Sequence, residues 1–595
     1  MARAFRVGFA SLRYQFCYAK IPGMDSPARI ITLVSPNGEQ KISVSGEKDL
    51  LRELQNAGIC LPALCGGQGS CGKCRVRVIA GAMEASAADR AHFSAADLDA
   101  GCRLACTAFP LSDITVEIPS AGEEDFSALS DFEQIEPFLP GTSNEAPLET
   151  RPHTGEETSP RFAIAVDIGT TTLALALADL RTGKICSRLS AVNRQREFGA
   201  DVISRIQRAN AGDLGALSQC IRRQIAGCIR ELCRKAQANP QDIRKIAVAG
   251  NTTMLHLLLN LSCETLGRSP FTPVTLDMVS IPYHELFGEG IAGGTRGCET
   301  QDSDTLNCEV VILPGISTYV GADITAGILF AGLHKSANSL GLLPMEIHKK
   351  YAKQGFASVP AVLMDIGTNG EMVLAHGGKL LCTATAAGPA FEGGNILWGT
   401  GSVPGAISRV GFRDGKFEIA AIGNQPPIGI CGSAVVDTVY QGLKQGYILS
   451  SGRFSEKLAG RDIVLAKSPE GRDIVFCQKD VRELQLGKSA IRSGLDALLN
   501  HAGLSYDDIQ KLYIAGGFGF NLNLESCAGI GLIPAALKPK VSLIGNSALG
   551  GAIRYLLNAG TEKDLLQIKE QAEEYSLPTD SYFNENFITN IDFEI

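Results

Sequence analysis

One short pattern occurs twice in this chain and constrains its fold more than any other feature. A buried strand at residues 162–166 ends in Asp167-Ile-Gly-Thr, and a second one at 361–364 ends in Asp365-Ile-Gly-Thr. Each is followed by another apolar strand, then by a strand ending in small residues, and finally by a glycine-containing helix. Two similar halves in the same order indicate a gene duplication and predict two α/β lobes with a cleft between them.

The two Asp-Ile-Gly-Thr turns have the composition of a phosphate and Mg²⁺ site. Backbone N–H groups and threonine hydroxyls bind phosphate oxygens, and an aspartate holds Mg²⁺ or orients the attacking water. One such turn alone is a weak signal, but the duplication and a later Ala515-Gly-Gly-Phe-Gly favour nucleotide binding. The residues leave open which aspartate activates water; Asp365 is favoured, with Glu371 as a helper.

Three other glycine-containing segments resemble parts of a phosphate-binding site. Residues 388–395 and 429–437 could each form a wall of the cleft or a tight structural turn, and both readings stay open. Gly487-Lys-Ser resembles the end of a P-loop, but Arg482 stands where that motif requires glycine. Because 481–499 has helical periodicity, we expect a structural helix there.

A cluster of cysteines marks a different chemistry near the N-terminus. Cys65, Cys71 and Cys74 lie in a glycine-rich loop, and Cys106 follows after 31 residues. This spacing predicts a [2Fe–2S] cluster with four thiolate ligands. Cys102 could compete with Cys106 for the fourth position. A four-cysteine zinc site is the alternative, and the long glycine-rich first gap argues against it.

The strands around the cysteine loop predict an α+β domain of the β-grasp type. Strands are expected at 29–34, 41–44, 75–79 and 114–118, with an amphipathic helix at 49–58. Residues 120–160 contain ten acidic residues, one basic residue and five prolines, which is typical of a solvated tether. The predicted parts of the chain are an N-terminal extension (1–27), a [2Fe–2S] domain (28–119), an acidic linker (120–160) and two α/β lobes of a nucleotide-binding part (161–360 and 361–595).

Composition narrows the range of partners. The net charge is −8 and no basic stripe is interleaved with aromatic residues, which disfavours nucleic acid. No apolar run reaches the roughly 18–20 residues that a membrane span needs. The eighteen cysteines, without a signal peptide, favour metal ligands and free thiols in a cytoplasmic protein.

Together these motifs resemble the reductive activators of corrinoid proteins, over residues 29–558. The resemblance rests on the cysteine loop, the acidic linker and three motifs: Asp-Ile-Gly-Thr-Asn-Gly-Glu, Ala-Gly-Pro-Ala-Phe-Glu-Gly and Ala-Gly-Gly-Phe-Gly. It implies a ferredoxin-like domain joined to a duplicated ATPase of the acetate kinase/sugar kinase/Hsp70/actin superfamily. The implied activity is ATP-dependent reduction of a corrinoid protein from Co(II) to Co(I), with electrons passing through the cluster.

The resemblance also implies roles for individual residues. The implied catalytic residues are Asp365, Asp167 and Glu371. The implied nucleotide-binding residues are Gly169, Thr170, Thr171, Gly367, Thr368, Asn369, Gly516, Gly517 and Gly519. The implied cluster ligands are Cys65, Cys71, Cys74 and Cys106. Further implications are Mg²⁺ with the ATP, a homodimer, and a low-potential donor such as a ferredoxin, flavodoxin or reductase.

Other functions remain open at this stage. The chain could be an ATP-driven electron donor to another metalloenzyme, although known donors of that class share a [4Fe–4S] cluster between subunits. It could be a redox-gated ATP-binding regulator without electron output, or a small-molecule kinase. The sequence does not identify the corrinoid protein or the electron donor.

Overall fold

The structure is a computed structural model, and it places most of the chain in two compact units. It describes residues 29–35, 38–44, 48–57, 59, 61, 67, 69, 74–110, 112–118, 162–288, 306–336, 359–517 and 522–594. Of the described residues, the smaller unit contains 29–61 and 69–118, and the larger unit contains 162–594 together with Gly67. The predicted extension (1–27) and linker (120–160) lie outside the described residues.

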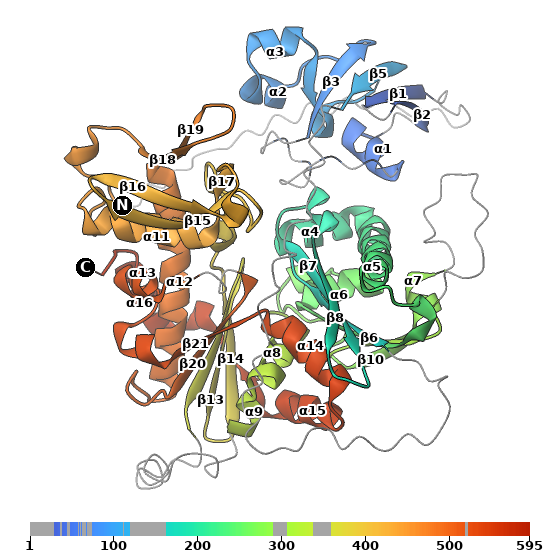
Figure 1. The fold of residues 1–595 in the computed structure, drawn as a ribbon. Coiled ribbons are helices and arrows are strands. Elements are labelled where there is room, and N and C mark those ends of the chain that lie inside the picture. Colours follow the sequence, from blue (N-terminus) through green and yellow to red (C-terminus); the bar gives the residue numbers. More distant parts are fainter. Residues whose placement is uncertain are drawn as a thin grey trace, which may run out of the picture. The chain divides into compact units, whose positions relative to one another are not determined.

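The smaller unit is a mixed five-stranded sheet with an N-terminal helix packed on it (Figure 1). Its strand order is β2-β1-β5-β3-β4, with β1 and β5 parallel and the other pairs antiparallel. The predicted β-grasp fold is confirmed, but the short elements α2, α3 and β4 were not predicted. The elements are β1 (Arg29–Ser35), β2 (Gly38–Val44), α1 (Leu50–Asn56), β3 (Arg75–Ala80), α2 (Ala87–His92), α3 (Ala95–Asp99), β4 (Cys102–Leu104) and β5 (Ile114–Glu117).

Helix α1 shows why the local sequence folds as predicted. The Asp49 carboxylate caps the helix by accepting a hydrogen bond from the backbone N–H of Arg52 at 2.9 Å. Leu50, Leu51 and Leu54 are buried, as their helical spacing requires for one apolar face.

Two six-stranded sheets form the framework of the larger unit, and both have the same core topology. Their orders are β10-β11-β9-β6-β7-β8 and β21-β20-β12-β13-β14-β22. If the edge strands β10 and β22 are left out and the other strands of each sheet are numbered in chain order, both sheets have the order fifth, fourth, first, second, third. This shared order confirms the duplication. The strands are β6 (Phe162–Ile168), β7 (Thr172–Asp179), β8 (Ile185–Val192), β9 (Ile243–Gly250), β10 (Val279–Pro282), β11 (Glu309–Ile312), β12 (Ala361–Ile366), β13 (Gly370–His376), β14 (Lys379–Thr385), β20 (Lys511–Ala515), β21 (Val541–Gly545) and β22 (Ala572–Glu574).

The glycine-containing helices that follow the last core strand of each repeat, α8 and α14, pack against each other between the sheets (Figure 1). Small residues permit this close approach, because a Cβ at Gly551 would lie 2.0 Å from the carbonyl oxygen of Ala326. The helices of this unit are α4 (Val202–Arg208), α5 (Leu214–Ala236), α6 (Thr252–Leu259), α7 (Tyr283–Phe287), α8 (Ala322–Ala331), α9 (Leu333–Ser336), α11 (Gly432–Lys444), α12 (Gln478–His501), α13 (Leu524–Gly529), α14 (Ser547–Leu557), α15 (Thr561–Gln571) and α16 (Ser581–Thr589).

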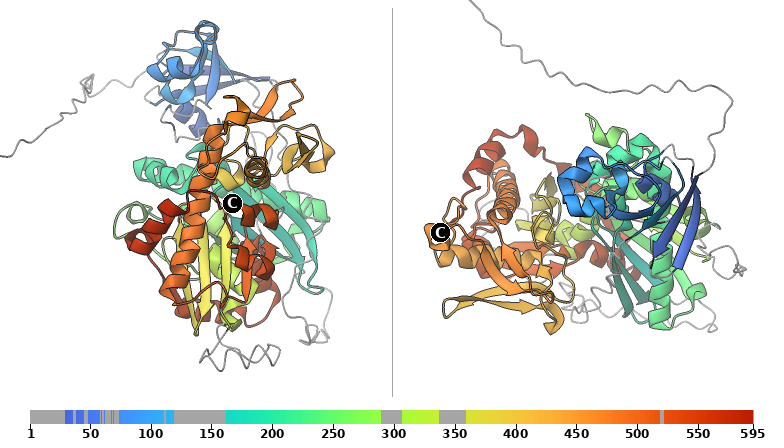
Figure 2. Two further views of the ribbon diagram at one scale, coloured as in Figure 1. Left: turned by 90° about the vertical axis from the view of Figure 1, so that its left-hand side faces the viewer. Right: turned by 90° about the horizontal axis from the view of Figure 1, so that it is seen from above.

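The second half also contains an insertion that the sequence did not predict. It comprises β15 (Ala406–Arg413), β16 (Lys416–Ala421), β17 (Gly429–Ile430) and the hairpin β18 (Ile463–Lys467) and β19 (Asp473–Phe476). These strands share one apolar core with α11 and the long helix α12, which is orange in Figure 2.

Helix α12 contains the P-loop-like Gly-Lys-Ser, and the prediction of a structural helix is confirmed. The buried Lys488 ammonium donates to the carbonyl of Asp592 at 2.7 Å, and the Ser489 hydroxyl donates to the carbonyl of Phe587. This motif therefore anchors the C-terminal segment. None of the helices in the described ranges has both the length and the apolar character that a membrane crossing requires.

Candidate nucleotide site

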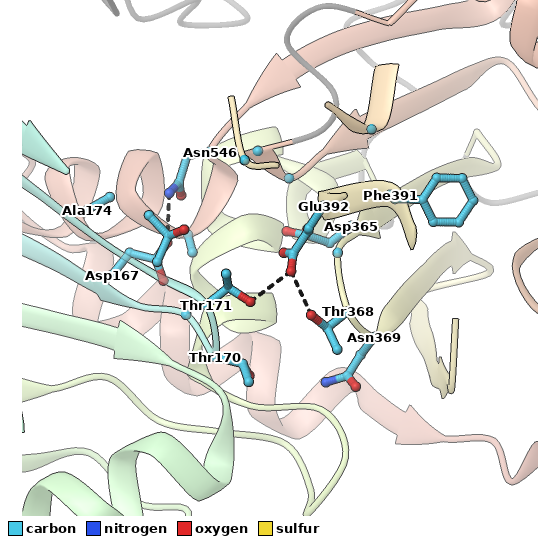
Figure 3. Close-up of a pocket in the computed structure, with 18 of the residues that line it drawn as sticks. Asp167, Thr170, Thr171, Ala174, Asp365, Thr368, Asn369, Phe391, Glu392 and Asn546 are labelled. Carbon is cyan, nitrogen blue, oxygen red and sulfur yellow. Dashed lines mark hydrogen bonds between the residues drawn. The ribbon is translucent and has the colours of Figure 1, made fainter. Parts of the chain in front are cut away.

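Both Asp-Ile-Gly-Thr turns open into one pocket of the larger unit (Figure 3). The first turn joins β6 to β7 and the second joins β12 to β13. Both are closed by a backbone hydrogen bond of 2.9 Å, from Gly169 to Thr172 and from Gly367 to Asn369. The pocket residues include Asp167, Gly169, Thr170, Thr171, Asp365, Gly367, Thr368, Asn369, Glu371, Gly516 and Gly517.

Of the carboxylates that border this pocket, Glu371 is buried, and Asp167, Asp323 and Asp365 are half-buried. Burial raises the pKa of Asp167, Asp323 and Asp365 to about 7, and the charge of Asp323 raises that of Asp365 further. Burial also raises the pKa of Glu371, which pairs with Asp365 across the β12–β13 ladder, well above its usual value. Clustered carboxylates of this kind are the oxygen donors that a hard divalent cation prefers.

Two of the aspartates are held by neighbours at the start of α14. The Asn546 side-chain amide donates to Asp167 at 2.7 Å (Figure 3), and the Ser547 hydroxyl donates to Asp365 at 3.3 Å. Asn546 also caps α14 through the N–H of Leu549. The segment between β21 and α14 therefore fixes one aspartate from each repeat.

The first turn is supported from behind by two buried side chains. The Asn193 amide donates to the carbonyl of Gly169 at 2.8 Å, and the Arg205 guanidinium donates to the carbonyl of Thr170 at 2.6 Å. Both side chains are fully buried. Because a peptide's C=O and the next N–H point in opposite directions, the N–H groups of Thr170 and Thr171 face away from these supports.

The wall opposite the first turn comes from the two segments whose role the sequence left open. Phe391 and Glu392, in the 3-10 helix η8 (Pro389–Glu392), line the pocket, as do Gly432 and Ser433 at the start of α11. Glu392 Oε2 accepts hydrogen bonds from the hydroxyls of Thr171 at 2.8 Å and Thr368 at 2.7 Å (Figure 3). Both segments thus form part of the cleft wall.

The glycines after β20 border the pocket beside Asp365. Gly516 has φ +99°, and a Cβ there would lie 2.4 Å from the carbonyl of Ile366 and 2.9 Å from the Asp365 carboxylate. Only glycine permits β20 to approach the second turn this closely. Gly517 also lines the pocket, whereas Gly519 lies outside the described residues.

Sequence reasoning did not assign a site role to several residues that the structure brings together. These are Asp323, Glu392, Asn546 and Arg205. The first three lie within motifs already noted, but no spacing rule shows which side chain of a turn faces the cleft. Arg205 lies in a polar helical stretch, and no motif or spacing in the sequence marks it as a residue of the site.

In the smaller unit, the strand register separates the two candidates for the fourth cluster ligand. Cys74 precedes β3, and its carbonyl accepts a hydrogen bond from the N–H of Ala105 at 2.8 Å, directly before Cys106. Cys102 instead pairs with Arg77, three residues further along β3, or about 10 Å at about 3.3 Å per residue. Cys74 and Cys106 are both buried, whereas Cys65 and Cys71 lie outside the described residues.

Three protein-family models match successive parts of the chain. A 2Fe-2S iron-sulfur cluster binding domain matches residues 34–111, the RACo middle region matches 162–336, and the C-terminal domain of RACo, the ASKHA domain, matches 359–594. The two RACo models together span more than half of the chain. The chain belongs to the RACo family. The predicted fold class, an iron–sulfur domain followed by a kinase/Hsp70/actin-type ATPase, is thereby confirmed.

Individual RACo relatives are similar over most of their length. The corrinoid activation enzyme RamQ of Eubacterium limosum is 29% identical over 618 residues, covering 93% of this chain and 98% of RamQ. The [Co(II) methylated amine-specific corrinoid protein] reductase of Methanosarcina barkeri is 24% identical, covering 73% and 77%. A solved structure of a reductive activator for corrinoid, iron-sulfur protein is 28% identical, covers 95% and 98%, and has a TM-score of 0.64. The resemblance to reductive activators of corrinoid proteins is confirmed.

Proposed function

We propose that this protein is an ATP-dependent reductive activator of a corrinoid protein, which it reduces from Co(II) to Co(I). The observation that carries the proposal is one pocket shared by both Asp-Ile-Gly-Thr turns, in a chain that also has a 2Fe-2S domain. The similarity to RamQ and to the Methanosarcina reductase supports the same activity.

For the electron path, we propose that Cys65, Cys71, Cys74 and Cys106 hold the [2Fe–2S] cluster. The hydrogen bond between the backbones of Cys74 and Ala105 favours Cys106 over Cys102 as the fourth ligand. The cluster supplies one-electron transfer. A ferredoxin, flavodoxin or reductase is the proposed donor that reloads it, and a homodimer is the proposed assembly.

For the nucleotide, we propose that phosphates lie between the two turns. The N–H groups of Thr170 and Thr171 face away from the supports of the first turn, as a phosphate site requires. Asp167, Asp323 and Asp365 border the same pocket, but no three of the described carboxylates are placed to ligate one metal ion directly. We therefore propose that the Mg²⁺ of the nucleotide is held by the phosphates and reaches these aspartates through its water ligands. Asp365 is the proposed residue that orients the attacking water, assisted by Glu371.

Coupling to ATP follows from the energetics of the acceptor. Reduction of Co(II) to Co(I) occurs at a very low potential, below the range where a ferredoxin-type cluster is an effective donor. About 59 mV of one-electron potential corresponds to about 1.4 kcal/mol. Nucleotide binding and hydrolysis can supply this difference if the protein binds the partner differently in its nucleotide-bound and free states.

The test combines the full chain, ATP, Mg²⁺, a strong reductant and candidate Co(II) corrinoid proteins, and follows the Co(I) absorption band. We expect Co(I) only when ATP is present, together with faster ATP hydrolysis in the presence of the corrinoid protein. Cys74→Ser should abolish Co(I) formation but leave ATP binding intact, because Cys74 belongs to the smaller unit and the pocket to the larger one. ATP-independent Co(I) formation, or hydrolysis unaffected by every corrinoid protein tried, would contradict the proposal.

A further inference from the structure

One carboxylate oxygen connects the two turns of the nucleotide site. Oε2 of Glu392 accepts hydrogen bonds from Thr171 of the first turn and from Thr368 of the second turn (Figure 3). The segment that carries Glu392 is itself fixed to the second turn, because the N–H of Gly388 donates to the carbonyl of Thr368 at 2.9 Å. Glu392 therefore lies between the hydroxyls that face each other across the pocket.

The donors that Glu392 uses are the donors that a phosphate would need. A threonine hydroxyl carries a single proton, so it cannot donate to Glu392 and to a phosphate oxygen at the same time. Hydrogen bonds to an ionised acceptor are also about twice as strong as neutral ones. A bound phosphate must therefore displace the Glu392 carboxylate from Thr171 and Thr368.

We propose that Glu392 is a positioning residue that takes the place of a phosphate group when no nucleotide is bound. Its carboxylate holds the hydroxyls of Thr171 and Thr368, and with them the two turns, in register until ATP arrives. The phosphate then takes both donors and Glu392 moves away. This inference rests on the proposed ATP site, and it means that Glu392 weakens ATP binding while ordering the free pocket.

A general charge effect could also weaken ATP binding, because several other carboxylates surround the pocket. The two explanations differ in whether the effect of Glu392 on ATP binding requires the hydroxyls of Thr171 and Thr368. If Glu392 acts through Thr171 and Thr368, its replacement should have no effect once both are valine. Simple repulsion between Glu392 and phosphate would persist in the Thr171→Val/Thr368→Val background. A double-mutant cycle therefore separates them.

The chain supplies its own reporter for the measurement. Trp398 is its only tryptophan, six residues after Glu392, and the neighbouring Thr400 and Gly401 line the pocket. The fluorescence of Trp398 can be followed while the full chain is titrated with Mg²⁺–ATP and, as a probe without phosphate, with adenosine. The variants are Glu392→Gln and Glu392→Ala, each in the wild-type and the double-valine background.

We expect both replacements of Glu392 to lower the Kd for ATP by on the order of tenfold, since hydrogen bonds to a charged acceptor no longer compete. The Kd for adenosine should not change, which also shows that the variants are folded. In the double-valine background the effect on ATP should vanish. A Kd for ATP that rises, stays unchanged, or falls equally in both backgrounds would overturn the inference. If the wild-type chain fails to bind ATP, the proposed function fails first, and the inference fails with it.

Discussion

The two Asp-Ile-Gly-Thr turns have the same tetrapeptide and the same place between two strands, but different support. In the first turn, two successive carbonyls accept hydrogen bonds from the buried side chains of Asn193 and Arg205. In the second turn, the carbonyl of Thr368 accepts a hydrogen bond from the backbone of Gly388, which belongs to the cleft wall. The backbone carbonyls of the first turn are thus held by side chains of its own repeat, and the second turn is held by the segment that carries Glu392.

The aspartates of the two turns differ in the same way. Asp167 is hydrogen-bonded to the neutral amide of Asn546. Asp365 accepts a weaker, longer hydrogen bond, and the charges of Asp323 and Glu392 add to burial in raising its pKa. The pKa values of Asp167 and Asp365 are both raised to about 7, so the two aspartates differ in the hydrogen bonds that hold them and not in basicity.

The largest expected effect is a difference in ATP hydrolysis between variants of Asp365 and Asp167. Asp365→Asn should lower kcat for ATP hydrolysis by about 10²–10⁴-fold, as expected for loss of a group that assists proton transfer from the attacking water, with ATP binding retained. Asp167→Asn should mainly raise the Mg²⁺ concentration needed for activity. Steady-state hydrolysis at several Mg²⁺ concentrations measures both effects. If both variants lose the same kcat, the division of roles is wrong.

The next prediction concerns the support of the first turn. Arg205 is fully buried, and among the described residues no carboxylate forms an ion pair with it. Burial accordingly lowers the pKa of Arg205 to about 10. We expect Arg205→Met to raise the Kd for ATP by about 10- to 100-fold, because Thr170 loses its backbone support. Its melting temperature should also fall, because the carbonyls of Gly199 and Thr170 each lose a buried hydrogen-bond donor.

A matched control lies one helical turn away. Arg208 is also buried in α4, but it forms an ion pair with Asp213 at 2.9 Å. Arg208→Met should therefore lower the melting temperature and leave the Kd for ATP unchanged. Calorimetry of unfolding and of ATP binding on both variants gives the comparison. A loss of ATP affinity in both, or in neither, would mean that Arg205 has no special role in positioning the turn.

The carboxylates that border the pocket predict how stability depends on pH. Folding raises the pKa of Asp167, Asp323 and Asp365 from 3.8 to about 7, so the folded state binds protons that the unfolded state has released. Stability should therefore fall as pH rises from about 4 to about 7, by up to about 1.4 kcal/mol per pH unit for each carboxyl. Urea unfolding of the nucleotide-free protein at pH 5, 6 and 7 measures the slope.

Asp323→Asn tests the origin of that slope. The variant should be more stable than the wild type at pH 7 and should show a smaller loss between pH 5 and pH 7. Saturating Mg²⁺–ATP should reduce the slope further in the wild type, because a bound cation favours the ionised carboxylates. An identical slope in the variant would assign the pH dependence to other groups.

Much of this architecture could be predicted because it is encoded in local patterns. The apolar strands before Asp167 and Asp365, the helix at 481–499 and the cysteine spacing each depend on near neighbours in sequence. The strands from β15 to β19 were not predicted, although β16, with the sequence Lys416-Phe-Glu-Ile, alternates in polarity as a half-buried strand does.

The contacts of the site that were not predicted depend instead on tertiary packing. Glu392 faces Thr171 only because η8 packs against α12, where a Cβ at Gly487 would contact the ring of Phe391 at 2.9 Å. Arg205 reaches Thr170 from a different helix. Neither contact leaves a periodicity or spacing that one sequence can show, so the sequence predicted the turns but not what holds them.

The smallest expected effect tests whether equivalent residues of the two turns are still equivalent in function. Thr170 and Thr368 occupy the same position of the repeat. However, the Thr170 hydroxyl is buried and accepts a hydrogen bond from Asn251 at 3.0 Å, whereas the Thr368 hydroxyl faces Glu392. Thr368→Val should raise the Kd for ATP by about two- to tenfold, the value of one hydrogen bond.

Thr170→Val should change that Kd by less than about twofold, since a hydroxyl directed at Asn251 contributes little of such a bond to phosphate. It should instead lower stability by about 1–3 kcal/mol, because the Asn251 amide is left without its acceptor. Titration with ATP and urea unfolding of the two variants separate these outcomes. Equal changes in ATP affinity would mean that both hydroxyls reach the phosphates, and that the duplicated turns have kept a symmetric role despite their different surroundings.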